Sequence, residues 1–246
     1  MAGHSKWANI KHRKERADAK KGKVFSRIAK EIISAAKLGG PDLKSNARLK
    51  AAVQKARDVN FPNDSIERNI KKGCSADQAA FHEITYELYG HGGVGLIVEV
   101  MTDNKNRIAS EMRIACTKRG GTIAEPGSVA YLFERKGVIE VARQGIDEES
   151  LFLATCESGA EDLSDEGDLF LILTPPEGLH AVKESIDALP AKVELAQLRM
   201  IPKALIECDE ETGSANLALI DWLEALDDVD AVYHNMTLPD SSSPGE

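Results

Sequence analysis

The spacing of apolar residues changes at about residue 80, and this change separates two kinds of structure. Before it, apolar residues recur every three or four positions, as they do in amphipathic helices. After it, segments such as HEITYELYG and VGLIVEVMT alternate or run continuously, as strands do. The chain is therefore expected to combine a helical N-terminal region with domains that contain sheets.

Three helices are predicted in the N-terminal region. The first is KVFSRIAKEIISAAKL, and the second is NARLKAAVQKARDV, with Ser45 or Asn46 as its N-cap. A shorter third helix lies within FPNDSIERNIKKG, where Asp64 and Glu67 have the spacing of a capping box. Because the links between them are short, these helices are expected to form a small bundle.

Two copies of one α/β topology are predicted after residue 80. Residues 136–202 read as strand, helix, two strands, helix and strand, the order of ferredoxin-like domains. The flanking segments give the same order when joined, with strands near 94–101, 122–124, 129–134 and 230–236 and helices at 104–118 and 213–226. The expected fold class is α+β. Its predicted parts are a basic arm and helical bundle at 1–79, an outer α/β domain at 80–135 plus 203–238, an inserted ferredoxin-like domain at 136–202, and a disordered tail at 239–246.

Charge is segregated along the chain. Residues 1–73 hold 19 Lys and Arg against 7 Asp and Glu, whereas residues 74–246 hold 12 against 33. A region with a net charge of +12 indicates a polyanionic partner, and nucleic acid is the most common one. The acidic remainder should be repelled by nucleic acid, so contact is expected from the N-terminal region. Neutralisation of one part by the other within the fold is the alternative explanation.

Cations in the arm and the first helix are the candidate nucleic-acid contacts. Trp7 lies among them and can stack on an unpaired base. TDNKNR adds two more candidates where a helix is expected to follow a strand, because a helix N-terminus flanked by cations can hold a phosphate. Plain capping by Thr102 or Asp103 is the alternative for that segment. The full set is Lys6, Trp7, Lys11, Arg13, Lys14, Arg16, Lys20, Lys21, Lys23, Arg27, Lys30, Lys105 and Arg107.

A glycine-rich stretch and the TDNKNR turn are the only hints of an enzyme. Gly90, Gly92 and Gly95 match GxGxxG, but a strand follows them where dinucleotide binding requires a helix, so a hairpin turn is predicted. The six histidines are scattered, and no hydrolase, zinc-protease or nucleotide-binding motif occurs. We therefore expect a protein that is not an enzyme, without cofactor or metal. An enzyme acting on a nucleotide or peptide is the least favoured alternative.

The cysteines and the hydropathy bear on the compartment. Cys74, Cys116, Cys156 and Cys208 are at least 40 residues apart and form no CxxC pair, so reduced thiols in a cytoplasmic protein are expected. No run of about 18 apolar residues occurs, so no membrane partner is expected. The sequence leaves the oligomeric state open.

Several strings resemble one protein family over nearly the whole chain. AGHSKWANIKHRK, NDSIERNIKKG, YGHGGVGLIVEVMTDNKNR and GAEDLSDEGD are similar to the YebC/PmpR family, whose relatives include the mitochondrial translational activator of cytochrome c oxidase. The resemblance implies a helical bundle and two α/β domains, one inserted in the other. The chain departs from the family pattern at Asn63, His91 and Arg119, where many members have a basic residue, Pro and Asn.

Two functions follow from the resemblance. The first is a transcriptional regulator that binds DNA through its basic N-terminal region. The second is a translation factor that associates with the ribosome, binds RNA and relieves stalling at difficult sequences such as polyproline. Both involve phosphate contacts, so the salt dependence of binding does not separate them.

Overall fold

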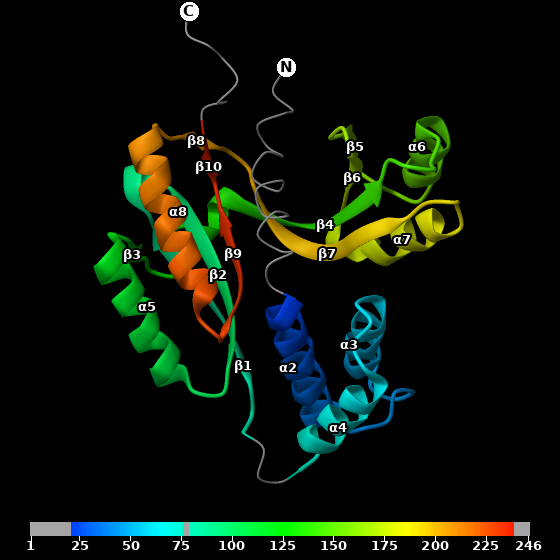
Figure 1. Cartoon of the computed structure of the whole chain (residues 1–246), viewed down its shortest axis with the longest axis horizontal. Coiled ribbons are helices and arrows are strands. Elements are labelled where there is room, and N and C mark those ends of the chain that lie inside the picture. Colours follow the sequence, from blue (N-terminus) through cyan, green and yellow to red (C-terminus); the bar gives the residue numbers. More distant parts are fainter. Residues whose placement is uncertain (1–20, 76–78, 239–246) are drawn as a thin grey trace, which may run out of the picture. The chain divides into compact units, whose positions relative to one another are not determined.

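The computed structural model describes residues 21–75 and 79–238 (Figure 1). Contacts divide these residues into two compact units. One unit is formed by residues 130–205, and the other by the remaining described residues. Residues 130–205 thus form a unit that is inserted in the sequence of the other unit. The basic arm up to Lys20 and the predicted tail at 239–246 lie outside the described residues.

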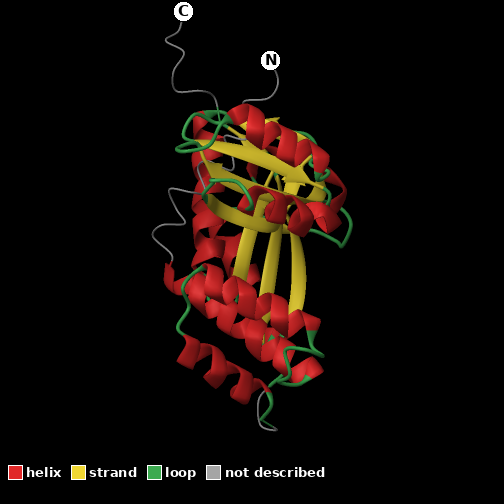
Figure 2. Ribbon diagram, turned by 90° about the vertical axis from the view of Figure 1, so that its right-hand side faces the viewer, coloured by secondary structure: helices red, strands yellow, loops and turns green. Residues whose placement is uncertain are grey.

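The N-terminal region forms the helical bundle that the apolar spacing predicted. Its helices are α2 (Lys21–Gly39), α3 (Ala47–Asp58) and α4 (Asn63–Gly73). Both α3 and α4 pack on α2, and Figure 2 shows these helices in red. Their inner faces bury a separate apolar cluster that includes Ile32, Leu49 and Ala56, none of which is exposed. Burial of this stripe is what stabilises such short helices.

The start of α3 depends on one buried amide. The Oδ1 of Asn46 accepts a hydrogen bond from the backbone N–H of Leu49, which makes Asn46 the N-cap. Its Nδ2 donates to the carbonyl oxygens of Ala35 at 2.8 Å and Gly40 at 2.9 Å. Asn46 therefore fixes the end of α2 and the beginning of α3 together.

Replacing Asn46 by alanine is expected to lower the free energy of unfolding by about 2 kcal/mol, because two carbonyls and one N–H lose their partner. Chemical denaturation measures this loss. Ser45→Ala is the control, since Ser45 is exposed and its hydroxyl bonds only to Asp42. The control should change stability by less than about 0.5 kcal/mol. Equal losses in both variants would contradict the role of Asn46.

The capping box predicted at the start of α4 is wrong. The helix begins at Asn63, and its N-cap residue is Pro62, which forms no side-chain cap. The carbonyl of Pro62 accepts hydrogen bonds from the N–H groups of Ser65 and Ile66. Because the proline fixes the backbone before the helix, Asp64 lies inside the first turn instead of at the cap position.

The outer α/β domain has a four-stranded antiparallel sheet in the order β3-β1-β2-β9. Its elements are β1 (His82–Tyr89), β2 (Gly95–Thr102), α5 (Lys105–Arg119), β3 (Thr122–Ile123), α8 (Glu210–Ala225) and β9 (Val229–His234). Two short strands, β8 (Ile206–Glu207) and β10 (Met236–Thr237), pair separately in parallel. The predicted strand at 129–134 is wrong. A turn of 3-10 helix occupies residues 130–132, and β4 of the other unit begins at Phe133.

β1 takes the place that the prediction gave to residues 129–134. The inserted domain orders its sheet β5-β6-β4-β7, and β1 occupies in the outer sheet the position that β6 has there. The outer domain is therefore a ferredoxin-like arrangement in which one strand comes from before the others in the sequence. Apolar spacing identifies a strand but not the sheet it joins, which explains the error.

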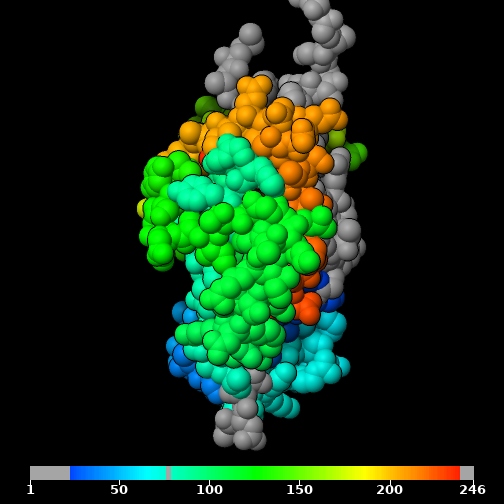
Figure 3. Space-filling model, turned by 90° about the vertical axis from the view of Figure 1, so that its left-hand side faces the viewer, coloured from blue at the N-terminus to red at the C-terminus, as the bar shows by residue number. Residues whose placement is uncertain are grey.

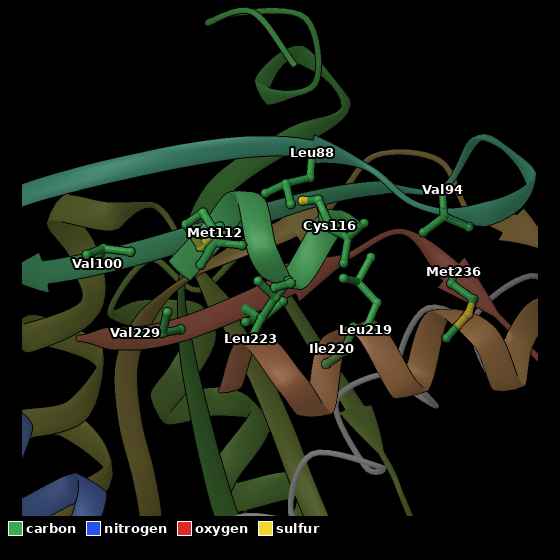
Figure 4. Packing of buried hydrophobic residues seen from close by; sticks show 14 of the residues in the cluster. Leu88, Val94, Val100, Met112, Cys116, Leu219, Ile220, Leu223, Val229 and Met236 are labelled. Atoms are coloured by element: carbon green, nitrogen blue, oxygen red, sulfur yellow. The ribbon is translucent and has the colours of Figure 1, made fainter. Parts of the chain in front are cut away.

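Helices α5 and α8 cover one face of the outer sheet. They lie side by side in Figure 3, in green and orange. Met112 of α5 and Leu219 and Leu223 of α8 meet Leu96 and Val98 of β2, and all five are fully buried. Figure 4 shows the helical side chains converging on the sheet.

The inserted unit has the ferredoxin-like order that the sequence predicted. Its elements are β4 (Phe133–Ala142), α6 (Glu148–Glu157), β5 (Asp162–Asp165), β6 (Leu169–Thr174), α7 (Leu179–Asp187) and β7 (Val193–Pro202). All three strand pairs are antiparallel. Its apolar cluster is distinct from those of the bundle and the outer domain.

The glycine-rich stretch forms the predicted hairpin between β1 and β2, which pair up to Tyr89 opposite Gly95. The turn is fixed by Asn216, whose amide accepts from the N–H of His91 and donates to its carbonyl. The Nε2 of His91 lies 2.7 Å from the carbonyl oxygen of Arg119. His91 and Arg119, two positions at which the chain departs from the pattern of the family it resembles, are therefore in contact.

Candidate nucleic-acid interface

The predicted contact residues fall into two groups. Those in the arm lie outside the described residues, and so does the side chain of Lys21. The residues Lys6, Trp7, Lys11, Arg13, Lys14, Arg16 and Lys20 make up the arm group. The second group lies within the described residues and consists of Lys23, Arg27, Lys30, Lys105 and Arg107. All of these except Lys105 make intramolecular ion pairs or hydrogen bonds.

Two lysines of α2 bind carbonyls of the outer domain, Lys23 at the end of α8 and Lys30 just after it and in β2. The ammonium of Lys23 donates to the carbonyl oxygens of Glu224 and, at 2.7 Å, Leu226. The ammonium of Lys30 donates to the carbonyl oxygens of Asp227 at 2.9 Å and Met101 at 3.1 Å. The last carbonyls of a helix carry the negative end of its dipole, so cations are favoured there. Both lysines therefore tie α2 to the outer domain.

Asp228 joins three elements. It is buried and accepts hydrogen bonds from Lys30 of α2, from Arg107 of α5 and from the hydroxyl of Thr102. Burial alone would raise the pKa of the Asp228 carboxyl, but these three donors outweigh burial and hold the pKa below its ordinary value. Asp228 is thus a charged group that its surroundings stabilise.

Asp230 has a different environment although it is only two residues away. Its carboxylate lies 3.8 Å from the Nε of Arg27, which is also 3.4 Å from Glu31. Burial raises the pKa of Asp230 to about 6, against the attraction of Arg27 and Lys30 and with the help of the nearby carboxylates of Glu31 and Glu99. Because this pKa is raised, the neutral form is favoured by the fold. That contribution to stability is complete below about pH 4 and is lost as the pH rises through 6.

The first N–H groups of α5, in the segment TDNKNR, are bonded by a side chain of the same segment. The side chain of Asn104 accepts hydrogen bonds from the N–H groups of Asn106 and Arg107, so neither Thr102 nor Asp103 caps α5 as predicted. Thr102 is fully buried and bonds Asp228 instead. Lys105 is exposed, and no ion pair joins it to another described residue.

Three exposed cations on α4 were missed in the sequence. Arg68, Lys71 and Lys72 are spaced i, i+3 and i+4, which places them on one side of the helix. All three are exposed, and within the described part of the chain none forms an ion pair. Arg68 makes only a hydrogen bond to the hydroxyl of Ser65. We call Arg68, Lys71 and Lys72 the α4 stripe. Its helical spacing was the signal available in the sequence.

The bundle as a whole is cationic. Residues 23–75 contain 12 Lys and Arg and only 5 Asp and Glu. Two more exposed cations, Lys50 and Arg57, lie on α3 without an ion pair to any described residue. Point charges of this kind on exposed helices attract phosphate but do not by themselves read base sequence.

Other kinds of site find little support in the described residues. No group of three or more His, Cys, Asp or Glu side chains there is placed to hold a metal ion. No described helix is long and apolar enough to cross a membrane. The four cysteines are free thiols, with Cys116 and Cys208 buried. Burial raises the pKa of both buried thiols, which makes them less reactive.

Comparison with known proteins identifies the family. Residues 5–76 match the model of the TACO1/YebC protein N-terminal domain, and residues 81–236 match that of the TACO1/YebC second and third domain. The chain belongs to the TACO1/YebC family. The two matches cover the bundle with its arm and the two α/β domains, as the resemblance implied.

Similar members of the TACO1/YebC family are known from several bacteria. A probable transcriptional regulatory protein of Protochlamydia amoebophila is 63% identical over 240 residues, which is 98% of each chain. One from Chlamydia pneumoniae is 61% identical over 96% of this chain and all of its own. The crystal structure of a conserved hypothetical protein from Aquifex aeolicus has a TM-score of 0.80 and 41% identity, covering 93% of this chain and 95% of that one.

Proposed function

We propose that the protein is a cytoplasmic regulatory protein that binds the phosphate backbone of nucleic acid through its basic N-terminal region, with DNA as the first candidate. The observation that carries this proposal is the segregation of charge together with the exposed α4 stripe. The names of the relatives, which are probable transcriptional regulatory proteins, agree with it.

The geometry supports backbone binding more than sequence readout. Exposed lysines and arginines on α3 and α4 can neutralise phosphates and release counterions. Direct readout needs side chains that reach base edges from a helix seated in the major groove. No described element carries a motif that would seat it in this way. An affinity that varies little with base sequence is therefore expected for the bundle.

RNA remains the alternative partner. The cations that bind a DNA backbone also bind an RNA backbone, and basic segments often bind structured RNA. A binding competition between RNA and DNA distinguishes the two partners. Preference for a ribosomal RNA hairpin over a mixed-sequence DNA duplex at equal salt would favour the translation-factor alternative, whereas preference for the duplex would favour the transcriptional regulator.

Replacing Lys71 and Lys72 by alanine is expected to weaken binding of the full chain to a mixed-sequence DNA duplex roughly 30-fold near physiological salt. It should also reduce the slope of log affinity against log salt by about 2, since each lysine that contacts phosphate contributes about 1. Fluorescence anisotropy at several salt concentrations measures both quantities.

The matched control changes Lys192 and Lys203 of the inserted domain to alanine. Both are exposed lysines, and the change in net charge is the same. The control should keep the wild-type slope. A slope reduced equally in both double variants would show that the loss follows net charge, and the α4 stripe would then have no specific part in binding.

A further inference from the structure

The contact between the bundle and the outer domain is built from charges. Lys23, Arg27 and Lys30 of α2 supply the donors, and the stretch from Glu224 to Asp230 supplies most of the acceptors. One further ion pair joins Arg48 of α3 to Glu83 of β1. The apolar clusters of the two parts share no residue. Polar contacts of this kind are typical of domains that can separate.

The acceptors on the outer domain resemble a phosphate backbone in chemistry. Carbonyls at the end of a helix are partly negative, and Asp228 and Asp230 add full charges. Lysine and arginine bind carboxylate and phosphate oxygens with similar charge-assisted hydrogen bonds. The ammonium of Lys30 meets three acceptors within 3.1 Å, which matches its three donors. It therefore has no donor left for a nucleic acid while this contact persists.

We propose that residues 224–230 act as an internal competitor for nucleic acid, which holds the cations of α2 until phosphate displaces it. We call this stretch the acidic edge. The inference rests on the proposed function and adds a regulation of the same site. In the closed form, the cations of α2 are engaged, whereas exposed cations of α3 and the α4 stripe are available to nucleic acid. In the open form, Lys23, Arg27 and Lys30 join them, so binding and opening are coupled.

Neutralising either of two acids of the edge should weaken the contact. Asp228 is held charged by Lys30, Arg107 and Thr102, so its neutralisation should open the contact. Asp230 faces Arg27 of α2, whose Nε lies 3.8 Å from its carboxylate, and the attraction of Arg27 and Lys30 exceeds the repulsion from Glu31. Its neutralisation should therefore weaken the contact too, but less than that of Asp228, because the Arg27 pair is longer than the bonds that hold Asp228.

The test compares Asp228→Asn, Asp230→Asn and Glu207→Gln in the full chain. Glu207 is an exposed carboxylate of the outer domain, and Glu207→Gln removes the same charge. The measured quantity is the affinity for a mixed-sequence DNA duplex and for an RNA of the same sequence, at pH 7 and fixed salt. Relative to Glu207→Gln, Asp228→Asn should bind about fivefold more tightly and Asp230→Asn about twofold more tightly.

A double variant locates the effect. With Lys30→Met present, Asp228→Asn should lose most of its gain over Glu207→Gln, because the cation that it releases is gone. If Asp228→Asn unfolds, Asp230→Asn still decides the matter. Charge alone would give Asp230→Asn the affinity of Glu207→Gln, whereas the internal competitor predicts tighter binding.

The outcomes also separate this inference from the proposed function. If the wild type binds neither DNA nor RNA, the proposed function fails and the internal competitor fails with it. If the wild type binds but Asp228→Asn and Asp230→Asn both match Glu207→Gln, only the internal competitor is overturned. Tighter binding by both variants than by Glu207→Gln would support it.

Discussion

Replacing Lys11, Arg13, Lys14 and Arg16 by glutamate is expected to weaken binding of the full chain to nucleic acid by at least about 1,000-fold near physiological salt. Four phosphate contacts are lost, and the new carboxylates repel the backbone. The arm lies outside the described residues, so the expectation rests on its charge and on the cationic bundle that follows it. Electrophoretic mobility shift with DNA and RNA measures the loss.

A control with the same change in net charge tests whether the loss of affinity is specific to the arm. The control replaces four lysines of the two α/β domains by glutamate and so makes the same change in net charge. These are Lys118, Lys183, Lys192 and Lys203. The control should lose far less affinity than the arm variant. Binding by the arm variant at the wild-type level would remove the arm from the interface, and the α4 stripe would have to account for the whole affinity.

The substitution Gly73→Ala is expected to lower the free energy of unfolding by about 3 kcal/mol and to disturb the bundle as a unit. A Cβ at residue 73 would lie 2.6 Å from the carbonyl oxygen of Ile33 and 2.8 Å from the Cβ of Ala36. Both atoms belong to α2, so α4 would have to move away from it. The α4 stripe would move as well, and the affinity for nucleic acid should fall.

Gly178→Ala is the matched control for this substitution. A Cβ there would meet its nearest atom, the Cδ of Pro175, at 3.5 Å, which is an ordinary contact. Its backbone has the negative φ that alanine adopts easily, so the change should be neutral or slightly stabilising. Thermal and chemical denaturation compare the two. A Gly73→Ala variant as stable as the wild type would contradict the close packing of α2 and α4.

The helices and the inserted domain could be predicted because local patterns determine them. Apolar spacing marked each helix of the bundle within about two residues of its observed ends. The inserted domain is one continuous segment, so its strands pair with neighbours in the sequence and the order can be read directly.

The outer sheet and the acidic edge depend on distant partners. β1 and the run at 129–134 look equally like strands, and only the tertiary fold decides which joins the outer sheet. Asp228 carries no local motif, yet it gathers donors from α2, α5 and β2, which are more than 100 residues away. Residues 224–230 together engage Lys23, Arg27 and Lys30. The sequence predicted these three only as cations available to nucleic acid.

Crosslinking in living cells, followed by mapping of nucleotide adducts on the protein's peptides, tests whether nucleic acid binds the basic N-terminal region. Adducts are expected to be concentrated in peptides from residues 1–75, and sequencing of the attached DNA and RNA names the native partner. Adducts confined to peptides from residues 80–238, or none above background, would contradict binding through the basic N-terminal region.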